Sequence, residues 1–194
     1  MRRREERSRE DRVVTVPNAI TVARLLLLPV VVFILLNTQD FILATAILMF
    51  IGATDFLDGY VARRFNQVSE LGRIIDPSAD RIVIVVISAL CLYMGWIPLD
   101  LGALILIRES IVTAISIYLF KVRGVRLDVI WLGKFGTLLL LVSLPIILLG
   151  ESRSPNFSVL HTGGLLVALV GIFILYGAVV QYLRFTLLPR RQKS

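Results

Sequence analysis

The chain has very little of the chemistry that builds many soluble sites. Its 194 residues include one cysteine, Cys91, and one histidine, His161. A single cysteine excludes an internal disulfide framework and any site held by several cysteines. A single histidine excludes a metal site made from a histidine cluster within one chain. Charged residues are also scarce, at 18%, whereas soluble domains usually carry roughly 25%.

Apolar residues take their place and make up 57% of the chain. This content excludes a disordered protein, which needs low hydrophobicity. A bilayer core about 30 Å thick is crossed by roughly 20 apolar helical residues. Six stretches approach that length, and their length and number favour helices over buried parallel strands. We therefore expect an all-α, polytopic membrane protein with six transmembrane helices, at residues 19–36, 41–54, 82–99, 101–120, 135–149 and 163–183.

The basic residues predict the orientation of these spans. Six arginines precede the first span, four basic residues follow the second, four follow the fourth and four lie near the C-terminus, whereas the three opposite connections contain only Arg153. By the positive-inside rule, both termini are then cytoplasmic. We divide the chain into a basic N-terminal segment (1–17), a membrane domain (18–188) and a C-terminal tail (189–194). The net charge of +7 then reflects orientation and anionic lipid headgroups, and we expect no nucleic-acid partner.

Four of only 14 acidic residues lie at the cytoplasmic ends of the second and third spans. Asp55 and Asp58 are three residues apart, and Asp76 and Asp80 are four apart, so each pair shares one helix face. A short connection between two antiparallel helices would bring the four carboxylates together, where they would repel one another. A hard divalent cation relieves that repulsion, and oxygen ligands favour Mg²⁺, Mn²⁺ or Ca²⁺ over Zn²⁺. The pattern predicts a divalent-cation site.

Two arginines near these aspartates, Arg63 and Arg73, are suited to phosphate oxygens. Carboxylates for a metal and arginines for phosphate together indicate phosphoryl-group chemistry on a phosphate-bearing lipid. The alternative is that the aspartates only cap helices and pair with nearby arginines, and Asp76 alone fits a cap. Four carboxylates on two neighbouring helices, accompanied by Gly59 and Gly72, disfavour that alternative.

The spacing of this stretch is D-x2-D-G-x2-A-R-x8-G-x3-D-x3-D. It resembles the signature of the CDP-alcohol phosphatidyltransferases, with every fixed position filled. The resemblance implies six spans with cytoplasmic termini and an enzyme that displaces CMP from CDP-diacylglycerol with an alcohol. It implies two divalent cations, Mg²⁺ or Mn²⁺, held by Asp55, Asp58 and Asp76. Asp80 would also bind metal and act as the general base on the acceptor hydroxyl.

The resemblance also implies a set of residues that bind the CDP-lipid. Gly59 would admit the nucleotide, and Arg63 would contact its phosphates. Asn18 and Thr21, at the start of the first span, would lie near the cytidine, although both are also suited to capping that helix. The implied CDP-lipid site comprises Asn18, Thr21, Gly59, Arg63, Ser69 and Gly72.

Charges inside the spans indicate an anionic acceptor. Arg24 lies more than one turn into the first span and must face the bundle interior, and Arg108 lies inside the fourth beside Glu109. Such residues are costly in a membrane and are commonly functional, although Arg108 and Glu109 could merely pair with each other. The element Gly133–Thr137 resembles the G-K-x2-T element of phosphatidylglycerophosphate synthases. Our candidates for acceptor binding are Arg24, Arg73, Arg81, Arg108 and Lys134.

We expect sn-glycerol 3-phosphate as the acceptor, so that the product is phosphatidylglycerophosphate. The main alternative is a cardiolipin synthase of the same family, which uses phosphatidylglycerol, and inositol phosphate comes after it. From other classes, a membrane transporter would show ion flux without CMP release, and a non-catalytic scaffold would tolerate loss of all four aspartates. We further expect membrane lipids as partners, a homodimer, and a bacterial inner membrane with the active site facing the cytoplasm.

Overall fold

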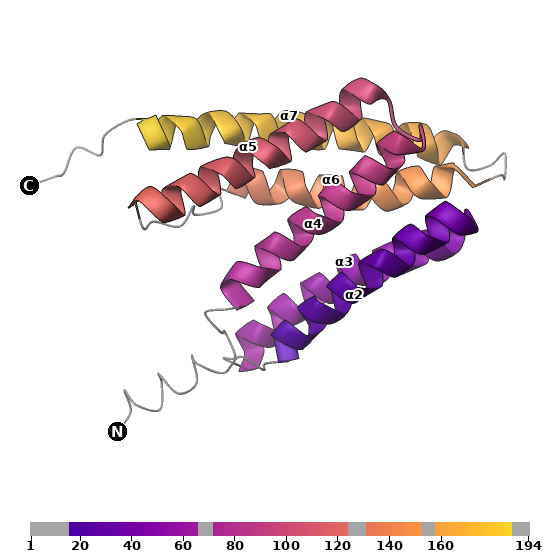
Figure 1. Ribbon diagram of the computed structural model, residues 1–194, viewed down its shortest axis with the longest axis horizontal. Coiled ribbons are helices and arrows are strands. Elements are labelled where there is room, and N and C mark those ends of the chain that lie inside the picture. Colours follow the sequence, from indigo (N-terminus) through magenta and orange to yellow (C-terminus); the bar gives the residue numbers. More distant parts are fainter. Residues whose placement is uncertain (1–15, 66–71, 124–130, 153–157, 188–194) are drawn as a thin grey trace, which may run out of the picture.

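The computed structural model describes residues 16–65, 72–123, 131–152 and 158–187 (Figure 1). These residues form helices joined by short connections, and none of them lies in a strand. The all-α expectation is confirmed for this part of the chain. The helices are α2 (Val16–Asn37), α3 (Phe41–Phe65), α4 (Gly72–Tyr93), α5 (Leu99–Arg123), α6 (Trp131–Gly150) and α7 (Ser158–Leu187).

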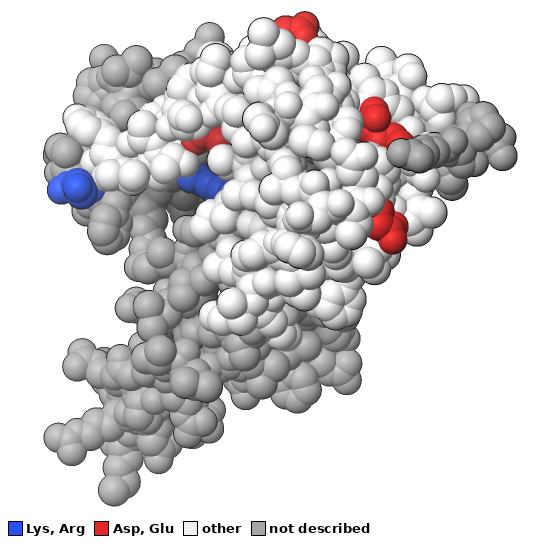
Figure 2. Space-filling model, turned by 45° about the vertical axis from the view of Figure 1, so that its right-hand side comes forward, with Lys and Arg blue, Asp and Glu red and all other residues white. Residues whose placement is uncertain are grey.

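Four of these helices contain stretches long and apolar enough to cross a bilayer: Ile20–Asn37, Leu99–Leu119, Trp131–Gly150 and Ser158–Gln181. The apolar part of α3, Phe41–Thr54, is shorter. Large apolar side chains cover the outer surfaces of the helices. Examples are Leu26 and Phe33 on α2 and Phe173 on α7, each more than half exposed. Figure 2 shows that most of the described surface on this face is uncharged, with a few separate charged residues and one acidic and one basic group close together in its middle. A surface of this kind requires an apolar solvent, as in a membrane protein.

The helices α3 and α4 carry the aspartate motif, and their bounds differ in part from the expected ones. The helix α3 continues without a break through Asp55 and Asp58 to Phe65, which confirms that this aspartate pair lies on one helix. The helix α4 begins at Gly72, so Asp76 lies inside its first turns instead of capping it. Both aspartate pairs are therefore on helical backbone, with the three- and four-residue spacings that the motif requires.

The third span ends earlier than residue 99, because α4 closes in a tight turn. Gly95 has a φ of 75°, the left-handed conformation that glycine adopts without a steric penalty. The Trp96 amide donates to the Cys91 carbonyl at 2.8 Å, and the Gly95 amide donates to the Leu92 carbonyl at 3.2 Å. These two bonds are the pattern of a helix ended by a left-handed residue. The prediction that the helix runs to residue 99 is wrong for this reason.

The helix α2 packs against both α3 and α4, while α6 contacts α3, α4 and α7, and α5 contacts α4 and α7. Figure 1 shows α5, α6 and α7 together on one side of the bundle and α2 with α3 on the other, with α4 crossing between them. Among the described residues, α3 and α4 each pack on α2, and they make at most a slight contact with each other. The core between the helices includes the fully buried Leu35, Ile84, Ile87 and Leu148.

Glycines allow α6 and α7 to pack with their backbones close together. A Cβ on Gly136 would lie 2.6 Å from Leu175 Cγ and 3.1 Å from the Gly171 carbonyl oxygen. A Cβ on Gly150 would lie 2.3 Å from the backbone nitrogen of His161. Small residues at helix contacts of this kind are typical of membrane bundles. Gly136 belongs to the predicted G-K-x2-T element, and in the structure it serves the contact with α7.

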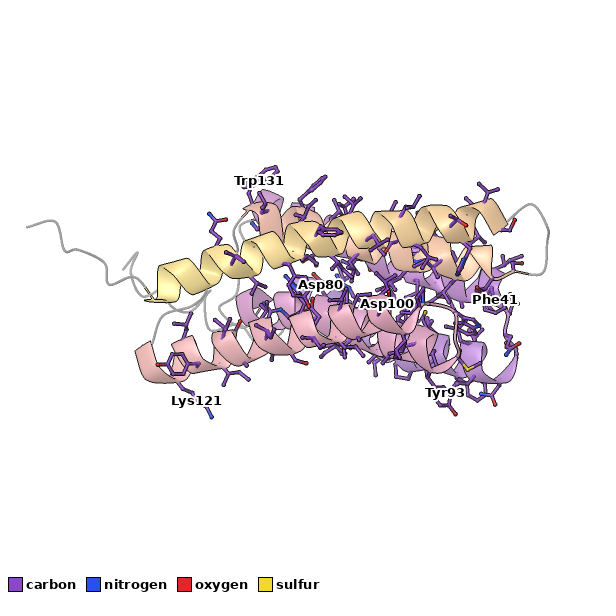
Figure 3. All side chains as sticks on the ribbon, turned by 90° about the horizontal axis from the view of Figure 1, so that it is seen from above. Phe41, Asp80, Tyr93, Asp100, Lys121 and Trp131 are labelled. Atoms are coloured by element: carbon purple, nitrogen blue, oxygen red, sulfur yellow. The ribbon has the colours of Figure 1, made fainter. Side chains whose placement is uncertain are left out.

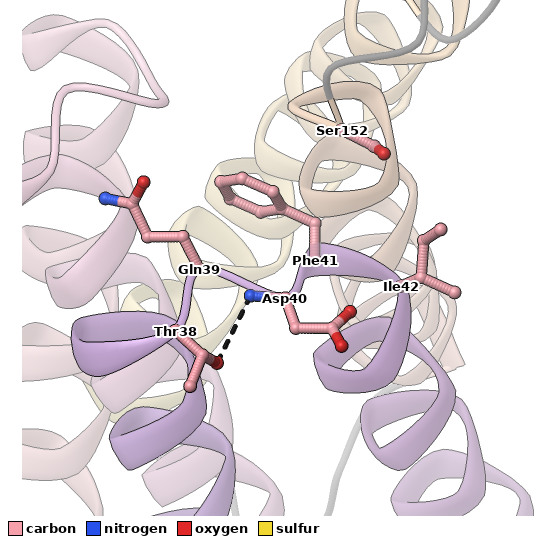
Figure 4. A pocket seen from close by; sticks show the side chains of 6 residues that line it. All are labelled: Thr38, Gln39, Asp40, Phe41, Ile42 and Ser152. Atoms are coloured by element: carbon pink, nitrogen blue, oxygen red, sulfur yellow. Dashed lines mark hydrogen bonds between the residues drawn. The ribbon is translucent and has the colours of Figure 1, made fainter.

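The two ends of the bundle differ in character. Figure 3 shows Lys121 and Trp131 at one end, with Phe41 and Tyr93 at the other. At the second end Phe41 and Trp96 meet edge to face, with ring centroids 5.0 Å apart. A pocket of about 350 Å³ lies there (Figure 4), where Asp40 caps α3 by accepting the Leu43 amide at 3.0 Å. The residues that line it, none of them a predicted site residue, are Thr38, Gln39, Asp40, Phe41, Ile42 and Ser152.

Candidate active site

The centre of the candidate site is Asp80, which projects from α4 into the interior of the bundle (Figure 3). Arg24 of α2 donates from Nη1 to Asp80 Oδ1 at 2.8 Å. The Arg24 side chain is 1% exposed and the Asp80 side chain 22% exposed. The hydrogen bond is charge-assisted and therefore strong, and it fixes the orientation of the carboxylate. Asp80 thus keeps limited contact with the outside of the bundle while α2 holds it in place.

Thr21 lies on the same side of α2 as Arg24, three residues earlier, and is fully buried. Residues three apart share a helix face. Two predicted site residues on α2, one for the CDP-lipid and one for the acceptor, therefore both face the bundle. The expectation that Arg24 turns inward is confirmed, and the structure adds that its partner is Asp80.

A second contact joins α4 to α5 next to Asp80. Arg81 donates from Nη1 to Ser116 Oγ at 3.4 Å. Ser116 in turn donates its hydroxyl to the Val112 carbonyl at 2.7 Å, which leaves its oxygen lone pairs to accept from Arg81. Arg81 is partly exposed, so its cation stays accessible near Asp80 while α5 restrains it.

Arg108 and Glu109 are buried in the middle part of α5, with 5% and 2% exposure. Arg108 Nη1 donates to Glu109 Oε1. The alternative that Arg108 and Glu109 pair with each other is therefore confirmed. Lys134, by contrast, is exposed on the first turns of α6, while Gly133 beside it is buried.

Most of the residues predicted to bind the CDP-lipid or the metal have side chains that the structure does not describe. The backbone is helical at Asn18, Asp55, Asp58, Gly59, Arg63, Gly72, Arg73 and Asp76, but their side chains are not described, and Ser69 lies outside the described residues. The metal site therefore stays a prediction. The donor set suits it chemically, since four carboxylates offer hard oxygen ligands and no sulfur or imidazole.

Sequence reasoning missed the contacts that charged residues make between helices. Arg24 and Asp80 were assigned separately, one to the acceptor and one to the metal and the proton, yet they contact each other. Ser116 was not a candidate, and a serine in an apolar helix gives little signal. Glu109 was recognised with Arg108 as a functional charge inside a span, but it was not among the candidate site residues.

The Arg24–Asp80 pair gives a direct test of the arrangement. Arg24→Met should destabilise the protein by about 3 kcal/mol, because it removes the charge-assisted hydrogen bond of a largely buried ion pair. Arg24→Lys should lose less, since it keeps the charge but not the planar fork. Thermal unfolding in detergent measures both. In the combined Arg24→Met, Asp80→Asn variant the two effects should not add, and full additivity would contradict the pairing.

Comparison with known proteins covers nearly the whole chain. Residues 14–183 match the family model described as CDP-alcohol phosphatidyltransferase. A Mycobacterium tuberculosis protein provisionally named a cardiolipin synthase is 33% identical over 174 residues, which are 89% of this chain and 83% of that protein. The CMP-forming cardiolipin synthase of Streptomyces coelicolor is 34% identical over 76% of this chain and 71% of its own. The CDP-diacylglycerol–glycerol-3-phosphate 3-phosphatidyltransferase of Rickettsia typhi is 32% identical over 71% and 78%. The chain belongs to the CDP-alcohol phosphatidyltransferase family.

Proposed function

We propose that this enzyme transfers the phosphatidyl group of CDP-diacylglycerol to sn-glycerol 3-phosphate, releasing CMP and forming phosphatidylglycerophosphate. Membership of the family supports the donor and the leaving group. The Rickettsia relatives, which carry the name of this reaction at 31–33% identity, support the acceptor.

The observation that carries the proposal is the position of Asp80, inside the bundle and oriented by Arg24 at 2.8 Å. In the proposed reaction Asp80 accepts the proton of the acceptor hydroxyl. The hydroxyl oxygen forms a bond to the phosphorus that bears diacylglycerol, and the bond from that phosphorus to the CMP oxygen breaks. CMP leaves with the electron pair of that bond, and the product is a phosphodiester. Proton transfer by a well-positioned base contributes about 10²–10⁴-fold to rates of this kind.

Divalent cations, Mg²⁺ or Mn²⁺, belong to the proposal as the partners of Asp55, Asp58, Asp76 and Asp80. When bound, such ions neutralise pyrophosphate charge and stabilise a phosphate leaving group. The protein's own residues would position the carboxylates and bind the nucleotide. The helix backbone at the motif sets the carboxylate spacing, and Gly59 and Arg63 on α3 would accommodate the nucleotide and its phosphates.

Basic residues on α4 and α6 support an acceptor that carries phosphate. Arg81 is partly exposed next to Asp80, and Lys134 is exposed at the start of α6. Arg24 and Arg108 each bond a carboxylate, whereas Arg81 bonds the neutral Ser116 hydroxyl and Lys134 is an exposed cation. A phosphate monoester such as glycerol 3-phosphate carries more negative charge than a phosphodiester, so basic side chains of this kind attract it more strongly.

A second candidate is cardiolipin synthesis, with phosphatidylglycerol as the acceptor. The observation in its favour is that the relatives from Mycobacterium tuberculosis and Streptomyces coelicolor carry that name at 33% and 34% identity. Both candidate acceptors present a glycerol hydroxyl to the same phosphorus. They differ in whether the acceptor is water-soluble or a lipid.

The proposed setting is a bacterial cell membrane. In this setting all six helices cross the bilayer, both termini face the cytoplasm, and two copies form a homodimer. The grouping of basic residues in the sequence supports the orientation. In Figure 3, Lys121 and Trp131 share one end of the bundle, which is the cytoplasmic end in this orientation.

The experiment is CMP release by the purified full chain in detergent micelles containing CDP-diacylglycerol. Glycerol 3-phosphate, phosphatidylglycerol, inositol phosphate and serine are supplied separately, and the lipid product is identified by mass. We expect CMP and phosphatidylglycerophosphate with glycerol 3-phosphate. Cardiolipin formed from phosphatidylglycerol alone would establish the second candidate, and no CMP release with any acceptor would refute both.

A further inference from the structure

The ion pair formed by Arg108 and Glu109 does not hold two elements of the fold together. The two residues are consecutive on α5, so the bond from Arg108 Nη1 to Glu109 Oε1 joins no two helices. Both are almost completely buried, with 5% and 2% exposure. Burying two charges is costly, and packed apolar residues would serve stability at least as well. Stability of the bundle therefore does not account for this pair.

Each residue of the pair also keeps one polar atom without a partner. Arg108 Nε and Glu109 Oε2 are buried and have no hydrogen-bond partner in the part of the chain that the structure describes. Such atoms are rare in folded proteins, because a buried donor or acceptor that makes no bond has lost its bond to water. One of these atoms is an obligate donor, and the other is an acceptor when the carboxylate is charged.

These two atoms define the chemistry of a complementary ligand. The ligand must offer an acceptor to Arg108 Nε and a donor to Glu109 Oε2. A phosphate could bond to Arg108 but would be repelled by the Glu109 carboxylate, and it has no donor when fully ionised. A hydroxyl group can do both, since it donates one hydrogen and accepts at its oxygen. The pair has no net charge, which also favours a neutral hydroxyl over an ion.

The candidate acceptors share a hydroxyl of this kind. Glycerol 3-phosphate attacks through one hydroxyl and keeps a second on the neighbouring carbon. The glycerol headgroup of phosphatidylglycerol likewise keeps a second hydroxyl beside the attacking one. We propose that Glu109 is a specificity-determining residue, whose Oε2 accepts a hydrogen bond from this second hydroxyl while Arg108 Nε donates to the same molecule. The inference rests on the proposed function and deepens it.

The two carboxylate oxygens of Glu109 would have different roles, which explains why an acid is useful at this position. Glu109 Oε1 restrains the guanidinium of Arg108, and Oε2 recognises the hydroxyl. An acceptor that lacks the second hydroxyl would leave Oε2 without a partner inside the bundle. Sites built to bond a hydroxyl discriminate strongly against an analogue without it for this reason.

The test combines removal of the hydroxyl with removal of the carboxylate. The wild-type enzyme and Glu109→Gln are each assayed for CMP release with glycerol 3-phosphate and with 3-hydroxypropyl phosphate, which lacks the middle hydroxyl. We expect wild-type kcat/KM to favour glycerol 3-phosphate by about 10- to 100-fold, the range for a hydrogen bond to a charged group. In Glu109→Gln this preference should largely disappear, whereas kcat/KM for 3-hydroxypropyl phosphate should change little.

The matched control is Ser110→Ala on the same helix, because the Ser110 hydroxyl is exposed and donates to the Leu106 carbonyl. It should keep the wild-type preference. If Glu109→Gln does not fold, Glu109→Asp retains the charge on a shorter side chain and should lose part of the same preference. If phosphatidylglycerol is the acceptor, the same comparison uses its analogue with a propanediol headgroup.

The outcomes separate this inference from the function on which it rests. An equal loss of kcat/KM with both acceptors in Glu109→Gln would mean that Glu109 only supports the fold or is bonded to water, and would overturn the inference alone. Retention of the full preference in that variant would do the same. Failure of the wild-type enzyme to release CMP with any acceptor would overturn the proposed function, and the inference with it.

Discussion

Asp80→Asn should lower turnover by about 10²–10⁴-fold, the contribution expected of a general base. The asparagine oxygen can still accept the hydrogen bond that Arg24 donates at 2.8 Å, but the buried guanidinium loses its counter-charge, so the variant should fold with reduced stability and its turnover is compared at equal amounts of folded protein. An amide cannot take the proton of the acceptor hydroxyl, and the effect should therefore fall on kcat. CMP release under saturating acceptor, together with a separate binding measurement for CDP-diacylglycerol, checks both halves of this expectation.

The matched control is Asp100→Asn, in the exposed first turn of α5. This change removes a carboxylate from the same protein without touching the candidate site, and turnover should remain near that of the wild type. Near-wild-type turnover in Asp80→Asn would exclude Asp80 as the base. A variant that also fails to bind CDP-diacylglycerol would instead place Asp80 in donor binding.

Removal of divalent cations should abolish CMP release, and Mg²⁺ or Mn²⁺ should restore it. The expected loss is at least about 100-fold, since cations on a phosphate leaving group contribute several kcal/mol and each 1.36 kcal/mol is tenfold in rate. Asp58→Asn should show the same loss at ordinary Mg²⁺ concentrations, because it removes one predicted ligand. Chelation, back-titration with each metal and a metal-dependence curve for the variant provide the measurement.

The control is Asp40→Asn, at the N-cap of the same helix. Asp40 caps α3 through the Leu43 amide at 3.0 Å, and asparagine caps a helix about as well as aspartate does. This variant should keep both stability and metal dependence. Full activity after chelation, or an Asp58→Asn variant with an unchanged metal requirement, would contradict the carboxylate-bound cations.

The parts of the fold that depend on short stretches of sequence could be predicted. The extension of α3 through Asp55 and Asp58 follows from the continuous apolar run that precedes them, and the structure confirms it. The end of α4 was predicted too late, because one apolar stretch was read as one helix. Gly95 and Pro98 were in the sequence, but only the backbone shows that Gly95 takes a φ of 75° and closes the helix there.

The sequence by itself determined that the protein is all-α and apolar enough for a membrane, and it supplied the candidate site residues, because those depend on composition and on spacing within one helix. Only the tertiary structure decided which charges meet. Arg24 and Asp80 are 56 residues apart, and Arg81 and Ser116 are 35 apart. The helices are apolar on all sides, so their pattern does not indicate which face meets which neighbour. Packing made that choice, and it turned Arg24 from a separate candidate into the partner of the proposed base.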